Sequence, residues 1–246
     1  MEYIQTDDGS NTLYSKKYNQ NFHSKIDGAL NEANLKYVIP TFNIFEDVKE
    51  LNILDICFGL GYNTFATILY ILENNISTKI NFYSPEFDRE LIKSLEKFDY
   101  PKEFERIANI IKEVSSNHYY QDEQFTINLY IGDARKYIKT ISNIDVVYQD
   151  AFSSDVNKEL WTIEYFKDIK HILSPKAILL TYSIATPVRL GLFENNLKIF
   201  QYKYNGKRKA TIATNYILDD GYFKYIDMDK KKINNPLAKP LYDEKI

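Results

Sequence analysis

Acidic side chains mark the ends of short apolar runs along the 246-residue chain. Asp55 lies within the first run, and Glu86, Asp133 and Asp150 each stand shortly after the end of a later one. If these runs are parallel strands of one sheet, the carboxylates gather at the edge where such sheets bind ligands. Several carboxylates attract a cation and repel a pyrophosphate. The pattern therefore indicates a site for a positively charged ligand that lacks phosphate.

Two glycines follow the first run, in the segment Asp55-Ile56-Cys57-Phe58-Gly59-Leu60-Gly61-Tyr62-Asn63. Gly59 and Gly61 let a ligand approach the backbone closely and let the chain turn into a helix. Such a turn on its own has little specificity, because many nucleotide-binding loops contain it.

The number and positions of the acidic residues indicate which cofactor this turn binds. A carboxylate after the second strand, here Glu86, suits the ribose hydroxyls of NAD and of S-adenosylmethionine alike. Asp133 suits an adenine amino group, and Asp150 with Asp55 suits a sulfonium or an amino group. These charges favour S-adenosylmethionine over a dinucleotide. The plain alternative is structural: Asp133 is also well placed to cap the helix that starts after it.

The residues around these acids alternate between strand and helix patterns. Apolar runs predict strands over 51–57, 79–84, 125–131, 144–148, 177–182, 198–204 and 210–217. Helical spacing predicts helices over 65–72, 90–97, 103–114, 134–141, 161–173 and 188–195. We expect Pro175 to separate a helix from the strand after it, and Asn205-Gly206 to form a hairpin turn.

This alternation predicts an α/β fold with a doubly wound, mostly parallel sheet that ends in a C-terminal antiparallel hairpin. Residues 1–50 show no such alternation and are expected to be an N-terminal extension that packs on the catalytic domain. Residues 51–220 form that domain. Residues 221–246 form a Lys-rich tail, expected to be a surface strap or partly disordered.

The composition excludes several classes of protein. With 1 Cys and 3 His, the chain has no disulfide framework and no cysteine-based zinc cage, and we expect no metal site. The net charge of -3 leaves only local basic surfaces for a nucleic acid. The first residues do not form a signal peptide, and apolar stretches fall short of the ~18 residues of a membrane helix. We expect a cytoplasmic protein without a membrane partner.

Several segments together resemble one family. They are Asp8-Gly9-Ser10-Asn11-Thr12-Leu13-Tyr14-Ser15, Phe22-His23-Ser24, Phe58-Gly59-Leu60-Gly61-Tyr62-Asn63, Asp150-Ala151-Phe152-Ser153, Glu159-Leu160-Trp161-Thr162 and Thr181-Tyr182-Ser183. From Thr6 to about Thr214 the chain resembles the tRNA 5-methylaminomethyl-2-thiouridine methyltransferases, as an MnmC-like methyltransferase domain of the stand-alone type. The resemblance implies a Rossmann-like class I S-adenosylmethionine-dependent methyltransferase. The implied reaction methylates the exocyclic amine of 5-aminomethyl-(2-thio)uridine at the wobble position of tRNA.

The resemblance also implies roles for individual residues. Gly59, Gly61 and Asn63 would lie along the cofactor, Asp55 near its amino group, Glu86 on the ribose, Asp133 at the adenine end and Asp150 between cofactor and target base. Cys57 departs from the family pattern, because it replaces a glycine of the loop. Pro85, Gln149 and Lys158 also look atypical but leave the relevant charges unchanged.

The target amine must lose a proton before it attacks, since a primary alkylamine is mostly protonated at neutral pH. A carboxylate beside an ammonium stabilises its charged form. We therefore expect Asp150 to orient the amine and balance charge, with the proton lost to water or through a relay. Phe152, Trp161 and Tyr182 are candidate walls that would stack on a flipped base. For Trp161 the alternative is a place in the helix core.

Contacts with tRNA require phosphate-binding cations despite the negative net charge. The hairpin residues Lys203, Lys207, Arg208 and Lys209 form the densest basic group, and Arg189 assists them. Lys224 and the run Lys230 to Lys232 of the tail form another basic group, for which a solvated surface is the plain alternative. His23 lies in a family-like segment, where either a site role or simple packing is open.

Two other functions fit the same residues. The first is another transferase that uses an adenosylmethionine-type cofactor, for small-molecule methylation or aminopropyl transfer. The second is a non-catalytic RNA-binding module with the same fold. The aminomethyl substrate would come from a separate enzyme, and the sequence does not indicate an oligomeric state.

Overall fold

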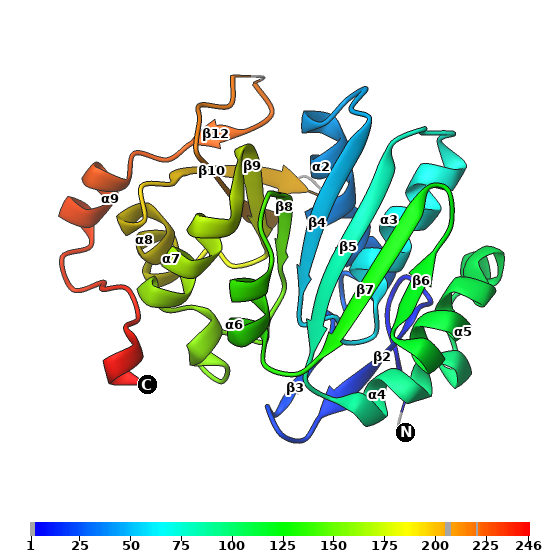
Figure 1. The fold of residues 1–246 in the computed structure, drawn as a ribbon. Coiled ribbons are helices and arrows are strands. Elements are labelled where there is room, and N and C mark those ends of the chain that lie inside the picture. The colour runs from blue at the N-terminus through cyan, green and yellow to red at the C-terminus, as the bar shows by residue number, and fades with distance from the viewer. Residues whose placement is uncertain (1–2, 205–207, 220) are drawn as a thin grey trace. The chain divides into compact units, whose positions relative to one another are not determined.

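The computed structural model describes residues 3–204, 208–219 and 221–246 (Figure 1). Contacts divide the chain into two compact units, Met1–Tyr137 and Ile138–Ile246. Both units combine strands and helices, and each is described by itself below.

The first unit begins with a small antiparallel sheet and a helical segment. The sheet has the order β1-β2-β3 and consists of β1 (Tyr3–Gln5), β2 (Asn11–Ser15) and β3 (Gln20–Asn21). The helical segment runs without a break through α1 (Ala29–Ala33), the π-helix η1 (Asn34–Val38) and α2 (Ile39–Ile44). Both α1 and η1 pack against α3, so this part of the chain is an ordered component of the first unit.

Parallel strands form the centre of the first unit. In the order β4-β5-β7, they are β4 (Glu50–Ile56), β5 (Lys79–Glu86) and β7 (Phe125–Ile131), and α3 (Tyr62–Glu73) connects the first two. Leu51 pairs with Ile80, which pairs with Phe125, so the three strands start in register. Their near-continuous apolar runs are typical of strands buried on both faces. The predicted strands over 51–57, 79–84 and 125–131 are confirmed.

The remaining elements of the first unit lie around β5 and β7. They are α4 (Arg89–Ser94), η2 (Leu95–Lys97), η3 (Lys102–Ile107), α5 (Ala108–Asn117), β6 (Tyr119–Gln121) and α6 (Ala134–Tyr137). The helix predicted over 103–114 starts as the 3-10 helix η3 and becomes α-helical only at Ala108. The short strand β6 pairs antiparallel with β7 and was not predicted, because three polar and aromatic residues carry no alternation.

The second unit contains the C-terminal antiparallel strands. Its elements are η4 (Ile138–Thr140), β8 (Ile144–Gln149), η5 (Lys158–Leu160), α7 (Ile163–Ile172), β9 (Leu173–Thr181), α8 (Thr186–Glu194), β10 (Lys198–Tyr204), β11 (Arg208–Thr214), β12 (Lys224–Tyr225), α9 (Met228–Asn234) and η6 (Asp243–Lys245). The strand order is β12-β10-β11-β9-β8. Strands β8 and β9 are parallel, and the other neighbours are antiparallel.

Pro175 lies inside β9, and the prediction that it separates a helix from a strand is wrong. Strand β9 already begins at Leu173, directly after α7. Its pairing with β8 is irregular here, because Ile144 pairs with Leu173 but Val146 pairs with Ile178. A proline is tolerated in a strand at such an irregularity, since its missing N–H breaks no ladder bond.

The predicted C-terminal hairpin is confirmed by the pairing of β10 with β11, which runs from Lys198 opposite Thr214 to Tyr204 opposite Arg208. The turn residues Asn205 and Gly206 lie outside the described residues. The tail is attached to the same unit, because the backbone N–H of Ile163 donates to the carbonyl of Leu241 at 2.9 Å.

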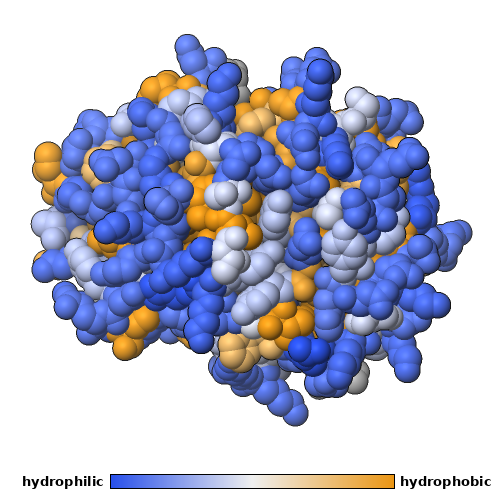
Figure 2. All heavy atoms as spheres, viewed as in Figure 1, coloured by the Kyte–Doolittle hydropathy of each residue, from blue (hydrophilic) through white to orange (hydrophobic). Residues whose placement is uncertain are grey.

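The α/β fold class is therefore confirmed, with a mostly parallel central sheet and a C-terminal hairpin. The boundaries of the three predicted domains stay a prediction. Hydrophilic side chains cover most of the visible face, with apolar patches between them (Figure 2). Among the described residues, no helix is long and apolar enough to cross a membrane.

Candidate functional site

The glycine turn after β4 is held in a left-handed conformation. Cys57, Gly59 and Gly61 have φ values of 62°, 56° and 73°. The backbone N–H of Gly61 donates to the carbonyl of Phe58 at 2.8 Å, which closes the turn. A non-glycine residue in this region is strained by about 1–3 kcal/mol. Cys57 thus keeps the backbone that a glycine would adopt.

Glu86 at the end of β5 is bonded to this turn. One carboxylate oxygen accepts the N–H of Gly59 at 2.8 Å, and the other accepts the N–H groups of Phe87 and Asp88 at 2.7 and 2.8 Å. Burial raises the pKa of Glu86, although the backbone hydrogen bonds from Asp88, Gly59 and Phe87 partly oppose this. A carboxylate has about four lone-pair positions, so three donors leave room for a ribose hydroxyl.

Asp55 and Asn63 are brought together, but in the protein interior. Asp55 is fully buried, and its carboxylate accepts the hydroxyl of Thr64 at 2.8 Å and the amide of Asn63 at 3.4 Å. These bonds attach the first turn of α3 to the end of β4. The geometry favours a role for Asp55 in positioning the helix N-terminus and the glycine turn before it.

The two glycines make room for different neighbours. A Cβ atom at Gly61 would stand 2.5 Å from the Phe65 ring and 2.8 Å from the Phe58 ring, so packing requires glycine there. A Cβ at Gly59 would meet the ring of Phe22 at 3.3 Å. Phe22, which directly follows β3, therefore lies against the turn. Sequence reasoning missed this residue, although it stands in the family-like segment Phe22-His23-Ser24.

A loop of the N-terminal segment caps the helix that begins at Ala29. The Asp8 carboxylate accepts the Asn31 N–H at 2.9 Å, and the Ser10 hydroxyl accepts the Ala29 N–H at 2.9 Å. Burial alone would raise the pKa of Asp8, but hydrogen bonds from Ser10, Asn31 and Thr6 together hold it below its ordinary value. These bonds join residues 8–10 to residues 29–31, at the two ends of the stretch that contains Phe22.

His23 has the contacts of a packed residue. Its Nδ1 lies 3.1 Å from the Thr12 hydroxyl, and its ring meets the edge of Tyr62 at a centroid distance of 4.9 Å. Burial lowers the pKa of His23 to about 4. The imidazole is therefore neutral near pH 7, and the packing interpretation fits better than a catalytic one.

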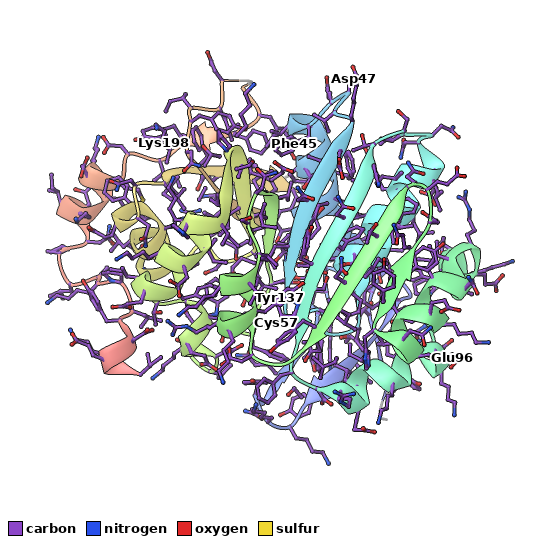
Figure 3. The ribbon with its side chains drawn as sticks, in the orientation of Figure 1. Phe45, Asp47, Cys57, Glu96, Tyr137 and Lys198 are labelled. Carbon is purple, nitrogen blue, oxygen red and sulfur yellow. The ribbon has the colours of Figure 1, made fainter. Side chains whose placement is uncertain are left out.

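Asp133 caps α6, as the structural alternative predicted. Its carboxylate accepts the N–H of Arg135 at 2.8 Å. The N–H of Gly132 donates to the carbonyl of Glu86 at 2.8 Å. The backbone of Asp133, the next residue, therefore lies near the end of β5. Tyr137 of α6 stacks on Tyr130 at a centroid distance of 4.7 Å. Figure 3 places Tyr137 and Cys57 at the edge of the first unit where β4 and β5 end.

Phe87 is a second candidate that sequence reasoning missed. Its ring is 71% exposed although it directly follows the buried strand β5 and Glu86. The ammonium of Lys17 lies 5.5 Å from the centre of this ring. An exposed aromatic face beside a ribose-binding carboxylate can stack on a planar base. The sequence signal that could have identified Phe87 is an aromatic residue directly after Glu86.

Asp150 of the second unit follows directly on β8 and is half-buried. Gln149 before it is fully buried: its amide donates to the Leu160 carbonyl at 2.9 Å and accepts the Tyr165 hydroxyl at 2.7 Å. These two bonds fix the end of the strand, and hence the starting point of the segment that presents Asp150.

The segment after Asp150 is held by two of the predicted aromatic residues. The indole N–H of Trp161 donates to the carbonyl of Phe152 at 2.8 Å, and the hydroxyl of Tyr182 donates to the carbonyl of Ala151 at 3.0 Å. Trp161 is fully buried, which fits the alternative of a core position and not a wall that stacks on a base. Phe152 and Tyr182 are half-buried and remain candidates for such walls.

The predicted RNA-binding residues are only partly described. Lys207 lies outside the described residues, and only the backbone of Arg208, in β11, is described. Arg189 on α8 is 4% exposed, and its Nε donates to the Thr211 hydroxyl at 2.9 Å. Its burial was not foreseen, because an arginine in a helix is usually placed at the surface.

The first unit fits an adenosine-bearing cation. Glu86 keeps acceptor capacity, the turn exposes no side chain at Gly59, and Phe87 offers an aromatic face. Glu86, Gly59 and Asp133 would hold S-adenosylmethionine. Asp55 and Asn63 would fix the conformation of the glycine turn from the protein interior.

Known proteins resemble the chain over most of its length. The model of an S-adenosyl-L-methionine-dependent methyltransferase family matches residues 100–216. The crystal structure of MNMC2 from Aquifex aeolicus superposes with a TM-score of 0.85 and 31% sequence identity, over 99% of this chain and 79% of that one. An uncharacterized protein of Methanocaldococcus jannaschii, MJ0670, is 33% identical over 216 residues, which is 85% of this chain and 58% of that protein.

A third relative is a longer protein, the tRNA 5-methylaminomethyl-2-thiouridine biosynthesis bifunctional protein MnmC of Leptospira interrogans. It is 24% identical over 175 residues, which is 67% of this chain and 27% of that protein. The chain thus spans only part of the curated relatives that it matches.

The family match and the similarity to MNMC2 show that the protein is an S-adenosylmethionine-dependent methyltransferase with a Rossmann-like fold. Within this class, the chain belongs to the family of MnmC-like methyltransferases.

Proposed function

We propose that the protein transfers a methyl group from S-adenosylmethionine to the exocyclic amine of 5-aminomethyl-(2-thio)uridine at the wobble position of tRNA. The observation that carries this proposal is the match to MNMC2 of Aquifex aeolicus over 99% of the chain. Further support comes from relatives named for the biosynthesis of tRNA 5-methylaminomethyl-2-thiouridine.

The cofactor supplies a methyl group on a positively charged sulfur. On the protein side, Glu86 accepts the ribose hydroxyls and Phe87 stacks on the adenine. Asp133 contributes its carboxylate at the adenine end, while its other contact caps α6. Gly59 lets the ligand approach the backbone.

Asp150 is the proposed partner of the amine. It does not act as a strong base, because a carboxylate stabilises the ammonium form and raises the pKa of the amine. It orients the amine, and the proton leaves to water or through a relay. The nitrogen lone pair then forms the new N–C bond, while the C–S bond breaks with its electrons on sulfur. The acceleration comes mainly from holding the nitrogen in line.

The anchored segment after β8 suits this role. Gln149, Trp161 and Tyr182 fix the backbone on both sides of Asp150 through hydrogen bonds of 2.8 to 3.0 Å. A carboxylate on so constrained a backbone keeps its direction without reorganisation when the substrate binds. Phe152 and Tyr182 would contact the flipped base.

The test uses labelled cofactor and tRNA from cells that lack this methylation step, followed by identification of the modified nucleoside. Label in 5-methylaminomethyl-(2-thio)uridine is the expected result. Asp150→Ala should lower turnover by a factor of about 100 or more, in the range of a lost catalytic group. Asp155→Ala, which removes an exposed acid from the same loop, is the matched control. Near-normal turnover of Asp150→Ala contradicts the role of Asp150.

The same incubation distinguishes the other candidate functions. Label in a small molecule but not in RNA indicates a small-molecule transferase, and RNA binding without turnover indicates a non-catalytic module. We also propose a functional link to a separate enzyme that makes the aminomethyl substrate, because the Leptospira relative is named a bifunctional biosynthesis protein.

A further inference from the structure

Arg189 carries a buried guanidinium group that is only partly satisfied. The residue is 4% exposed, and Nε donates to the hydroxyl of Thr211, which itself donates to the carbonyl of Ser183 at 2.6 Å. Among the described residues, the buried Nη2 atom has no hydrogen-bond partner. Burial lowers the pKa of Arg189 to about 10, so it stays charged at neutral pH. A buried charged donor without an acceptor is costly and rare in native structures.

Lys209 lies two residues before Thr211 on β11, so its side chain is on the same face of the strand as the hydroxyl that Arg189 binds. Burial lowers the pKa of Lys231 on α9, and the positive charges of Arg189 and Lys209 lower it further. Lys209 on β11 stands directly opposite Lys203 on β10, so both side chains lie on one face of the hairpin. Like charges in opposed positions destabilise a sheet. The arrangement therefore concentrates positive charge at a cost to stability.

Nearby carboxylates have other partners. Glu194 of α8 pairs with Lys232 at 2.6 Å, a contact that joins α8 to α9. Figure 1 shows these two helices on the same side of the second unit. The Asp227 carboxylate caps α9 by accepting the Lys230 N–H at 2.9 Å. Among the residues that the structure describes, Arg189, Lys209 and Lys231 form no ion pair with a carboxylate, so an external anion would balance their charges.

We propose that Arg189, Lys209 and Lys231 form a binding site for a backbone phosphate group of the RNA substrate. This inference rests on the proposed tRNA-directed function and assigns that function a contact surface. Phosphate oxygens would accept hydrogen bonds from the two lysines, and the buried guanidinium of Arg189 would add its positive charge behind them. Such contacts position an RNA without reading its sequence.

The test is the salt dependence of tRNA binding, measured by fluorescence anisotropy on the full chain. Lys209→Gln/Lys231→Gln should weaken binding about 10-fold or more and reduce the slope of log K against log salt by about 1 to 2. Lys167→Gln, an exposed lysine of α7, is the control and should leave the slope unchanged. Arg189→Lys should also weaken binding; because it alters a buried group, its folding is checked separately, and the lysine variants alone decide the outcome.

The outcomes separate this site from the proposed function. If the wild-type protein methylates tRNA and the double variant shows an unchanged slope of log K against log salt, the phosphate site is overturned. The proposed function then remains intact. A wild-type protein that neither binds nor methylates tRNA overturns both. Inorganic phosphate is the second probe. If phosphate raises the Tm of the wild-type protein but not that of the double variant, and both proteins bind tRNA equally, the site binds free phosphate. That result overturns the assignment to RNA.

Discussion

The carboxylate of Glu86 accepts a hydrogen bond of 2.8 Å from the backbone N–H of Gly59, 27 residues earlier in the chain. The acid at the end of β5 and the glycine turn after β4 therefore hold each other in place. This bond joins the ends of β4 and β5 at the edge of the first unit that we propose binds the cofactor.

Glu86→Gln should weaken S-adenosylmethionine binding about 10- to 100-fold, because a hydrogen bond to a charged group contributes about 1.5–3 kcal/mol. Isothermal titration calorimetry measures the Kd directly. Glu90→Gln is a matched control, since Glu90 is an exposed residue of α4 paired with Lys93. Equal affinity of wild type and Glu86→Gln would show that Glu86 does not contact the ribose.

Acidification should weaken cofactor binding through the same residue. Burial raises the pKa of Glu86, against the opposing backbone hydrogen bonds. Protonation removes the charged acceptor, so affinity is full at neutral pH and falls at a higher pH than for an ordinary carboxylate. Titrations at several pH values should show this fall in wild type, and a much flatter dependence in Glu86→Gln.

The effect of substituting Cys57 on stability should depend on how well the new residue tolerates a left-handed backbone, because the φ of Cys57 is 62°. Cys57→Gly should leave the free energy of unfolding within about 1 kcal/mol of wild type, since relieved strain offsets the added chain entropy. Cys57→Val should lower it by about 1–3 kcal/mol, because β-branched residues tolerate this region poorly. Urea unfolding measures both. Equal stability of the two variants would rule out a strained turn.

Gly28 and Gly9 offer a matched pair of substitutions, since both have a φ of 84°. A Cβ at Gly28 would stand 1.9 Å from Cγ of Asp8, whereas a Cβ at Gly9 meets nothing within 4 Å. Gly9→Ala should cost only the backbone strain, about 1–2 kcal/mol. Gly28→Ala should cost about 2 kcal/mol more, because Asp8 must move and lose its hydrogen bonds. Thermal unfolding that gives equal losses would contradict the packed contact.

His23 should make the protein less stable in mild acid. Burial lowers its pKa from 6.5 to about 4, so the unfolded chain binds the proton more tightly than the folded one. The stabilisation is complete above pH 6.5 and is lost as the pH falls towards 4, approaching about 3 kcal/mol. His23→Gln should remove this part of the pH dependence. His171→Gln, at an exposed position of α7, should leave it unchanged.

The sequence allowed the strands and the acids at their ends to be predicted, because buried parallel strands are continuous apolar runs. The end of β5 shows this: Glu86 stands where the run 79–84 indicated. Pro175 misled the prediction, since a local signal cannot show that β9 pairs irregularly. The burial of Arg189 and the contact of Phe22 with Gly59 were also invisible, because both depend on residues distant in the sequence.

The tail has a consequence for the half of the protein that bears Asp150. The hydroxyl of Thr162 donates to the carboxylate of Asp243, 81 residues later, at 2.7 Å. Thr162 adjoins Trp161, whose indole supports the loop after β8. Mutations near position 243 can therefore disturb turnover from a distance, and a library screened for activity should reveal intolerance in a region that looks dispensable.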